Sequence, residues 1–278
     1  MKIRLLMRVK VTFLVFFITP IILMLFSCQK KFTTPQDTSQ QPPDTLTYDQ
    51  ILQMVKTDLW ASYTFSKGSF ADQSGNHHDL TPSSGVNTTY DLLGNADEAI
   101  EFDGPDDYVV INDGKNFPDG DFSVSFSFMP ASTSGAIFGK GDIVNNKGYS
   151  FSVGFDDINN NHTLLFATNK TSDPCSNPFN INTPTTAFGT RNFSADGSWY
   201  YVVITYHDGE EHLYINNRDE VDLKTSTDAL KHCPSAPFFI GAPHSTGISG
   251  FRGKIDNLRI YTRVLTPREV QYFYWGFK

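Results

Sequence analysis

The hydrophobic pattern changes character along the chain. Four cations among the first ten residues precede an apolar run from Val11 to Phe26. From Leu59 onward, short stretches alternate apolar and polar residues, most clearly over Asp121–Met129, where phenylalanine and valine alternate with serine. A period of two is typical of a β-strand whose two faces meet different surroundings. The pattern therefore predicts a β-rich domain behind an apolar N-terminal segment.

Further strands are expected where aromatic and β-branched residues cluster between turns rich in Gly, Asn and Asp. These segments are Trp60–Phe65, Glu98–Phe102, Tyr108–Ile111, Ala136–Gly139, Tyr149–Phe155, Thr163–Ala167, Trp199–Tyr206, His212–Ile215, Phe238–Ile240 and Gly250–Tyr261. Asp208-Gly209 is a strong hairpin signal between two of them. Many short strands with few helices predict an all-β protein, built as a two-sheet antiparallel sandwich or a barrel.

One helix is expected near the C-terminus. Thr266 stands at the N-cap position, Pro267 at the first helical position and Glu269 two residues further on, which together make a capping box. The helix should run from about Pro267 to Tyr274. Val270 and Phe273 lie at helical spacing on the face that would pack against the sandwich.

The N-terminal segment has the order of a secretory signal peptide: cations, an apolar run and then a small residue. Leu25-Phe26-Ser27-Cys28 resembles a bacterial lipobox, although that pattern prefers a smaller residue than Phe26. The resemblance implies that Cys28 becomes the first mature residue and carries lipid. The alternative is a single transmembrane anchor, but about 16 apolar residues are short for a span of roughly 20. We predict a membrane-anchored lipoprotein of the bacterial cell envelope, facing the periplasm or the cell exterior.

The chain then divides into three parts. Residues 1–27 form the predicted signal peptide, residues 28–57 a flexible tether, and residues 58–278 the folded domain. The tether is rich in Pro, Gln, Thr and Ser as far as residue 48, and such a composition buries too little apolar surface to fold. Its last part, residues 49–57, would make a short helix or an irregular lead-in.

The charge of the mature chain excludes one class of partner. Residues 1–27 hold four cations and no acids, so their removal changes the formal net charge from −8 to −12. Nucleic acids need a basic surface, and none is expected as a partner here. An acidic chain is compatible with calcium sites, but charge alone does not show one, and an acidic surface that maintains solubility is the favoured alternative.

The chain has three cysteines, of which one is assigned to lipid and two remain. If Cys28 carries lipid, Cys175 and Cys233 remain as an even pair in an oxidising compartment, where disulfides persist. We predict a disulfide between them, the alternative being two unpaired thiols. No Cys and His spacing suggests a zinc site.

Several motifs together resemble the laminin G-like, concanavalin A-like jelly roll of secreted bacterial proteins. In chain order they are Asp72-Gln73-Ser74-Gly75-Asn76, Ala99–Val109, Phe122–Phe128, Trp199–Asn216, and Phe251–Tyr261 followed by Leu265–Val270. The resemblance covers about residues 58–275. It implies a two-sheet antiparallel jelly-roll sandwich with a short C-terminal helix, whose ligands are usually glycans or other proteins.

The same resemblance implies a structural calcium ion. In the family, the ion often lies where the Asp72 turn meets the C-terminal strand, which implies Asp72, Asn76 and Asp256 as ligands here. Carboxylate and amide oxygens are the ligands that calcium prefers. The alternative is an Asx-rich turn that is capped by its own side chains.

Catalytic relatives of this fold are glycoside hydrolases, whose chemistry needs two carboxylates about 5–10 Å apart. Trp199–Tyr206 and Phe122–Met129 contain no acid, and Glu210-Glu211 lies beside a hairpin turn, where solvated charge is expected. No Ser stands in a Gly-x-Ser-x-Gly motif. We therefore predict a non-catalytic binding module rather than an enzyme.

Three long polar loops would offer ligand contacts at the sandwich edge: Asp156–His162, Lys170–Thr190 and Asp228–Ala236. Phe179 in the second loop could stack on a sugar, but we favour the alternative, a buried anchor of the loop. The alternatives to a binding module are a structural or assembly protein of the cell envelope and a glycoside hydrolase.

Overall fold

The computed structural model describes residues 46–104, 106–111, 117, 120–142, 147–155, 163–168, 175, 185–188, 192–224, 233–234, 236–241 and 250–277. All of them belong to one compact unit, Pro42–Lys278. The predicted signal peptide, Cys28 and residues 28–45 of the tether lie outside the described residues, as do most residues of the three polar loops.

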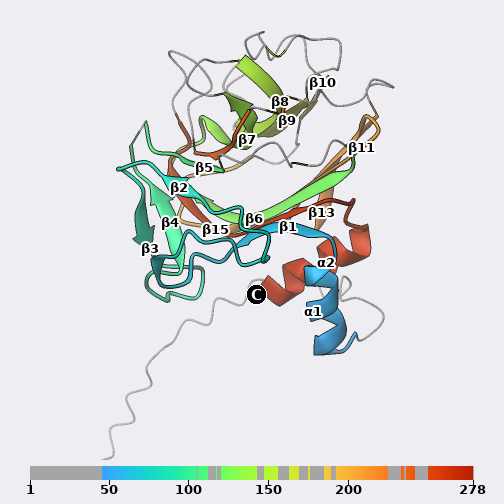
Figure 1. The fold of residues 1–278 in the computed structure, drawn as a ribbon, viewed down its shortest axis with the longest axis horizontal. Helices are drawn as coiled ribbons and strands as arrows, with labels where there is room; N and C mark the ends of the chain where they lie inside the picture. The colour runs from blue at the N-terminus through green and yellow to red at the C-terminus, as the bar shows by residue number, and fades with distance from the viewer. Residues whose placement is uncertain are drawn as a thin grey trace, which may run out of the picture. The chain divides into compact units, whose positions relative to one another are not determined.

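The unit is built on two antiparallel β-sheets that face each other (Figure 1). The first sheet has the order β13 (Arg218–Lys224), β12 (Glu210–Ile215), β11 (Tyr200–His207), β6 (Phe122–Pro130), β15 (Gly253–Tyr261), β4 (Ala99–Phe102) and β3 (Asn87–Thr89), with β1 (Leu59–Tyr63) also paired to β15. The second has the order β10 (Thr185–Phe188), β9 (Leu164–Thr168), β8 (Lys147–Phe155), β7 (Ala136–Asp142), β14 (Phe238–Ile240), β5 (Val109–Ile111) and β2 (Thr81–Pro82). The predicted two-sheet sandwich is confirmed.

Aromatic side chains fill the space between the sheets. Phe122 on β6 stacks on Phe151 of the opposite sheet, with 4.8 Å between ring centroids, and on Tyr206 of the neighbouring strand at 5.5 Å. Phe126 and Phe128 point the same way, and all three phenylalanines of β6 are fully buried. The alternation of the sequence therefore predicts the inward face of β6 correctly.

The opposite face of β6 is buried as well, which the alternation alone does not predict. Ser123, Ser125 and Ser127 are fully buried because a helical layer covers the first sheet on its outer side (Figure 1). That layer consists of α1 (Tyr48–Lys56) and α2 (Pro267–Phe277), which pack on outward aromatic residues of the sheet, Tyr201 and Tyr261 among them. Serine fits this face because its small side chain leaves room for the aromatic rings beside it.

Helix α1 occupies the last part of the predicted tether. Thr47 caps it, with its hydroxyl accepting from the Gln50 amide while the Gln50 side chain accepts from the Thr47 amide. Ile51, Met54 and Val55 pack against the cluster under α2. The helix alternative for residues 49–57 is thus the one formed, and ordered structure begins ahead of residue 58.

Helix α2 begins as the sequence predicts. The Glu269 carboxylate accepts from the Thr266 amide at 2.8 Å, and the Thr266 hydroxyl accepts from the Glu269 amide at 3.3 Å. These two bonds are the expected capping box. The helix runs three residues beyond the expected end, to Phe277.

Two hairpins extend the first sheet. The turn between β11 and β12 has positive φ at Asp208 (44°) and Gly209 (82°), as the predicted hairpin requires. The turn between β12 and β13 also has positive φ, at Asn216 (50°) and Asn217 (67°). Asparagine tolerates this conformation, so the hairpin forms without a glycine in the turn.

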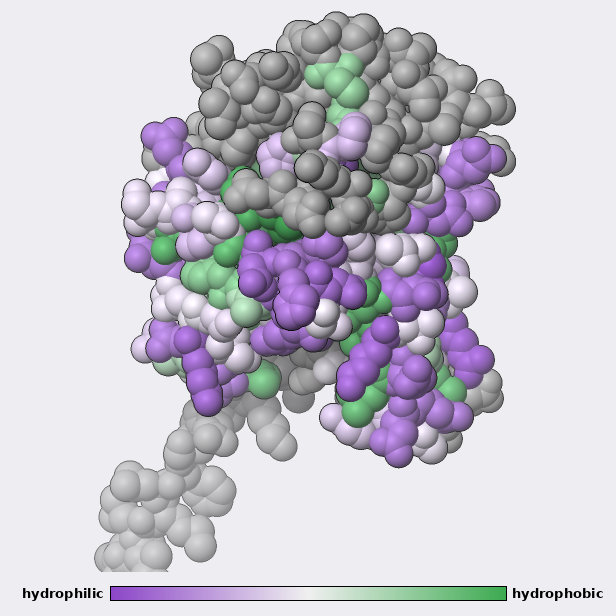
Figure 2. All heavy atoms as spheres, viewed as in Figure 1, coloured by the Kyte–Doolittle hydropathy of each residue, from purple (hydrophilic) through white to green (hydrophobic). Residues whose placement is uncertain are grey.

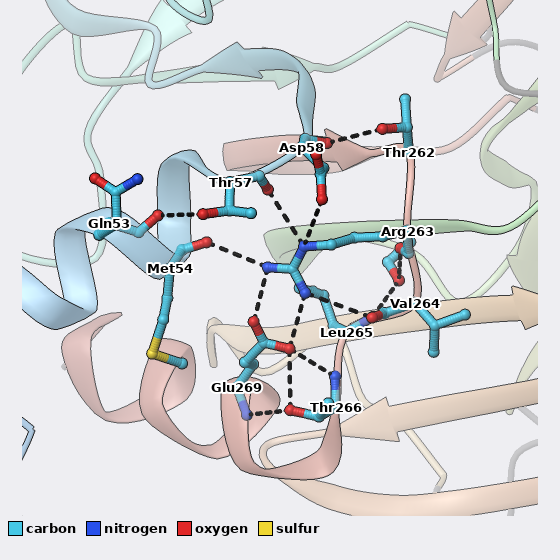
Figure 3. Close-up of polar contacts among 11 residues, drawn as sticks. Gln53, Met54, Thr57, Asp58, Thr262, Arg263, Val264, Leu265, Thr266 and Glu269 are labelled. Atoms are coloured by element: carbon cyan, nitrogen blue, oxygen red, sulfur yellow. Dashed lines mark hydrogen bonds and ion pairs between the residues drawn. The ribbon is translucent and has the colours of Figure 1, made fainter.

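One arginine joins the C-terminal end of α1 to α2 (Figure 3). The Arg263 guanidinium donates to the carbonyls of Met54 and Thr57 at the end of α1, at 3.2 and 3.3 Å. It also forms a two-bond ion pair with Glu269 on α2, at 2.7 and 2.8 Å. Burial would raise the pKa of Glu269, but hydrogen bonds from Arg263 and Thr266 hold it below its usual value. Arg263 therefore fastens the N-terminal helix to the C-terminal one.

We expect Arg263→Ala to lower the free energy of unfolding by about 2 kcal/mol, since several charge-assisted hydrogen bonds are lost together. Amide exchange should accelerate in α1 while the amides of β6 keep their protection. Urea denaturation and hydrogen exchange measure the two effects. Arg252→Ala, at an exposed arginine, is the matched control and should change neither. Unchanged exchange in α1 would show that Arg263 does not hold this helix.

Candidate functional site

Asp72 lies at the centre of the turn that the sequence nominates for calcium. One carboxylate oxygen accepts from the amides of Ser62 and Ser74, both at 2.9 Å. The other accepts from the Ser74 hydroxyl at 2.7 Å and the His78 amide at 3.1 Å. Burial would raise the pKa of Asp72, but these hydrogen bonds lower it below its usual value. Four donors thus occupy about the four lone pairs that a carboxylate offers.

Asn76 belongs to the same turn. Its side-chain amide donates to the carbonyls of Leu59 at 2.9 Å and Trp60 at 3.0 Å, which are on β1. The Ser74 hydroxyl also reaches the Trp60 carbonyl, at 3.1 Å. The turn is therefore held on β1 by its own side chains, as in the Asx-rich alternative.

Asp256 has different neighbours. It lies at a bulge of β15, where its oxygens accept from the backbone and side-chain amides of Asn257 at 2.6 and 2.8 Å. Burial raises the pKa of Asp256 to about 7, and the nearby charge of Asp91 adds to the rise. The hydrogen bonds thus bring Asp72 and Asn76 together in one turn, while the Asp256 carboxylate is bonded to Asn257. In the part of the chain that the structure describes, no three His, Cys, Asp or Glu side chains gather as a metal site.

Asp72→Ala should lower the free energy of unfolding by about 3 kcal/mol in a chelating buffer, because four donors lose their acceptor. Asp79→Ala is the control. Its carboxylate accepts from the Asp72 amide, and its removal should cost about 1 kcal/mol. Chemical denaturation of both variants is the measurement. Equal losses would mean that the four bonds to Asp72 are not what holds the turn.

Calcium binding at Asp72, Asn76 and Asp256 stays a prediction. Binding to the folded state alone stabilises by mass action, so calcium should raise the melting temperature and a chelator should lower it. Asp256→Ala should remove that difference. If calcium does not change the melting temperature, the turn binds no calcium and is capped by its own side chains.

Cys175 and Cys233 are joined by a disulfide, the pair that the sequence predicts, with their Cα atoms 5.8 Å apart. Cys233 is buried and Cys175 is exposed. Beside the bridge, the buried ammonium of Lys140 on β7 donates to the carbonyls of Cys233 at 2.9 Å and Ala236 at 2.8 Å. These bonds satisfy a charge that would otherwise be costly to bury, and they hold the crosslinked segment to the second sheet.

Glu211 corrects one expectation from the sequence. The hairpin position suggests solvated charge, but the side chain is 0% exposed. Glu211 shares the inward alternation of Leu213 and Ile215 on β12, so it points between the sheets. One oxygen accepts from the Thr168 hydroxyl of β9 at 2.6 Å, and the other has no hydrogen-bond partner among the described residues. Burial raises the pKa of Glu211 to about 8, against the lowering by Thr168.

A groove of about 660 Å³ lies where α1 and α2 meet. Leu46 and Met54 line it on one side and Thr266 and Arg268 on the other, with Arg263 between them. Since the polar groups of Arg263 already bind the protein itself, the groove is the seam of the two helices rather than a polar ligand pocket. No helix in the described ranges is both long and apolar enough to cross a membrane.

A loop at the edge of the first sheet, between β3 and β4, is not predicted as a site by the sequence pattern. Tyr90, Leu92 and Leu93 are exposed there, although the described surface is mostly hydrophilic with small separate apolar areas in the view of Figure 2. Asp91-Leu92-Leu93-Gly94 reads as an ordinary turn. Nothing in the pattern distinguishes an apolar residue that points outward from one that packs beneath the loop.

The sequence comparison assigns more than half of the chain to one family model. Residues 103–271 match the model described as the concanavalin A-like lectin/glucanases superfamily. The match begins after β4 and ends within α2, so it includes most strands of both sheets. No curated protein matches the chain.

Solved structures with a similar fold include domains that bind sugars and a protein. Domain 4 of AbnA, an extracellular arabinanase from Geobacillus stearothermophilus solved with arabinotriose, is 19% identical with a TM-score of 0.58. The similarity covers 77% of this chain and 97% of that domain. The ligand-binding domain of botulinum neurotoxin serotype D, solved with N-acetylneuraminic acid, is 16% identical with a TM-score of 0.59.

The binding domain of botulinum neurotoxin DC, solved with rat synaptotagmin II, is 15% identical with a TM-score of 0.60. For both neurotoxin domains the similarity covers 81% of this chain and 52% of the other. This chain thus spans about half the length of the neurotoxin domains, and nearly all of the arabinanase domain.

Proposed function

The chain belongs to the concanavalin A-like lectin/glucanases superfamily, and from this membership we propose that it is a non-catalytic module that binds glycans at the bacterial cell envelope. The observation that carries the proposal is the similarity to domain 4 of the arabinanase. That domain was solved with arabinotriose, and the similarity extends over 97% of its length. A fold of this kind can thus serve as a separate sugar-binding unit.

The residues of the core favour binding over hydrolysis. A glycosidase needs two carboxylates that reach the sugar from opposite sides of the bond. The central strands β6 and β11 contain no acid, and Glu211, an acid with the raised pKa of a proton donor, is wholly enclosed. An enclosed carboxyl cannot contact a polysaccharide, so we assign it to the packing of the two sheets.

A glycan array probed with the full chain tests the proposal. We expect saturable binding to a defined group of glycans, lost when the chain is denatured. Incubation with the same polysaccharides should release no reducing ends. Binding to no glycan would refute the proposal, and release of sugar would replace it with the hydrolase alternative.

A protein ligand is the second possibility, because the neurotoxin DC binding domain of similar fold was solved with synaptotagmin. In that case the glycan array would show no binding, while a purified envelope protein would bind the chain saturably. A structural or assembly role in the envelope would show neither result.

We further propose that lipid on Cys28 anchors the module to a membrane. The support is the signal-peptide pattern before Cys28 and the polar segment that follows it. Cys28→Ala should abolish incorporation of labelled fatty acid and move the protein from the membrane fraction to the soluble one. Ser27→Ala, which keeps a small residue before the cysteine, should retain both. If the wild-type protein carries no lipid, the proposal that lipid on Cys28 anchors it is wrong.

A further inference from the structure

Exposed apolar side chains are concentrated on one loop. Within the described part of the chain, the large hydrophobic residues that stay exposed are Tyr48 on α1 and three residues between β3 and β4. Those three are Tyr90, 59% exposed, Leu92, 36%, and Leu93, 72%. Scattered exposed hydrophobics are normal in soluble proteins, whereas a group at one tip suggests a contact surface.

The loop is held in shape before any ligand arrives. One Asp91 oxygen accepts from the amides of Leu93 and Asn95, at 2.9 and 2.8 Å, and the other accepts from the Asn95 side chain at 3.0 Å. The Asp91 amide donates to the Asn95 carbonyl at 3.1 Å. Burial would raise the pKa of Asp91, but these hydrogen bonds lower it, so the carboxylate stays ionised and keeps its bonds. A loop ordered in advance loses little entropy on binding.

The base of the loop is fixed to the rest of the sandwich. The Thr88 hydroxyl donates to Asp97 at 2.6 Å, and the Gly68 amide donates to the Asp97 carbonyl at 2.9 Å. The loop follows β3, which ends the first sheet, so it lies at an edge of the sandwich. Tyr90, Leu92 and Leu93 are therefore presented to solvent on a rigid support.

The surroundings of the apolar group decide which ligand it fits. Polar and charged residues border it, among them Asn95, Asp97 and Glu98. A wholly apolar ligand would strip water from these groups without replacing their hydrogen bonds. A sugar is amphipathic: the C–H face of its ring can lie on the Tyr90 ring, and its hydroxyls can donate to amide and carboxylate oxygens. We propose that the loop Tyr90–Asn95 is a glycan-binding site of this chain, an inference that rests on the proposed function.

Charge narrows the class of glycan. Three acids, Asp91, Asp97 and Glu98, lie in the loop or where it leaves for β4. Lys67 is beside the base of the loop, since the Gly68 amide bonds the Asp97 carbonyl, and the three acids outnumber it. An acidic sugar brought to this site would meet charge of its own sign, which weakens binding and slows association. The site therefore selects neutral oligosaccharides over those that carry uronate or sialic acid.

The test uses the full chain, arabinotriose as the neutral probe and trigalacturonic acid as the acidic one. By calorimetry, Tyr90→Ala and Leu93→Ser should each weaken arabinotriose binding at least tenfold, because each removes part of the apolar surface. Tyr48→Ala, at an exposed tyrosine on α1, is the matched control and should stay within twofold. Trigalacturonic acid should bind at least tenfold more weakly in low salt, and the gap should narrow at high salt.

The outcomes separate this inference from the proposed function. If glycans bind but both loop variants bind them as the wild type does, the site lies elsewhere and the inference is wrong. Equal affinity for the acidic and neutral probes would refute the charge selection. If no glycan binds while a purified protein loses affinity for the Leu93→Ser variant, the loop is a protein contact and both proposals fail.

Discussion

Glu211→Gln should make the protein more stable at neutral and alkaline pH, although it replaces a native residue. In the folded state burial raises the pKa of Glu211 to about 8, whereas in the unfolded chain it is near 4.5. Between these two values the unfolded state has released the proton that the folded state still holds. Stability therefore falls as pH rises, by about 1.4 kcal/mol per pH unit.

Between pH 4.5 and about pH 8 the wild type should lose about 5 kcal/mol of unfolding free energy relative to the variant. Glutamine reproduces the neutral carboxyl: its carbonyl can accept from Thr168, and no charge forms at higher pH. The two proteins should match near pH 4 and differ most above pH 8. Urea denaturation at a series of pH values measures the difference.

Glu210→Gln is the matched control, because Glu210 is on the same strand but half-exposed, beside His212. Its pH dependence should follow the wild type. If Glu211→Gln and the wild type keep the same slope between pH 5 and pH 8, Glu211 is not buried as described, and the contact between β12 and β9 is wrong.

The second large effect is expected in the core. Phe122→Ala should cost about 4 kcal/mol, because the ring leaves a cavity between Phe151, Tyr206 and Phe117 that the two sheets cannot close. Ser123→Ala, one residue along, should cost about 2 kcal/mol, since its buried hydroxyl donates to the Arg263 carbonyl at 2.8 Å and accepts from the Leu265 amide at 2.9 Å.

Ser84→Ala, at an exposed serine, should change stability by less than about 0.5 kcal/mol. Guanidinium unfolding of the three variants gives the comparison. A Ser123→Ala variant as stable as the Ser84 one would contradict the burial of Ser123 beneath the segment that leads from β15 into α2, where Arg263 and Leu265 bind its hydroxyl.

These residues also mark how far the sequence predicts the fold. Alternation places Phe122, Phe126 and Phe128 correctly, because a period of two is typical of a strand with one face buried against a second sheet. The alternation cannot show that Ser123 is buried too. Small polar residues give the same pattern on a face that is open to solvent and on one that other elements cover. α1 could be predicted only as one of two alternatives, because a helix of nine residues is too short to be stable alone and depends on packing against α2 and on Arg263.

The sequence pattern is least informative about structure where side chains are charged. Strand β13 is rich in Asp, Glu, Lys and Arg, so its sequence gives no strand signal, and it is formed by pairing with β12. Glu211 is next to a hairpin turn, but its alternation with Leu213 and Ile215 and its pairing with Tyr206 place it on the core face. The predicted calcium ligands combine Asp72 and Asn76, which share a turn, with Asp256, whose carboxylate is hydrogen-bonded to Asn257.

The disulfide is predicted because two cysteines leave one pairing once Cys28 is set aside, a matter of counting rather than of geometry. Tyr90 is the opposite case. Its exposure depends on the hydrogen bonds that fold Asp91–Asn95 back on itself, and no periodicity encodes that. Sites on loops are accordingly the part of this protein that sequence patterns describe least.

The most direct test of the glycan-binding account is a titration of the ¹⁵N-labelled full chain with the neutral glycan that binds best on the array, followed by amide chemical shifts. We expect a saturable set of shifts centred on residues 90–97 that is absent in Tyr90→Ala. No saturable shift with any glycan, at concentrations up to the millimolar range, would contradict it.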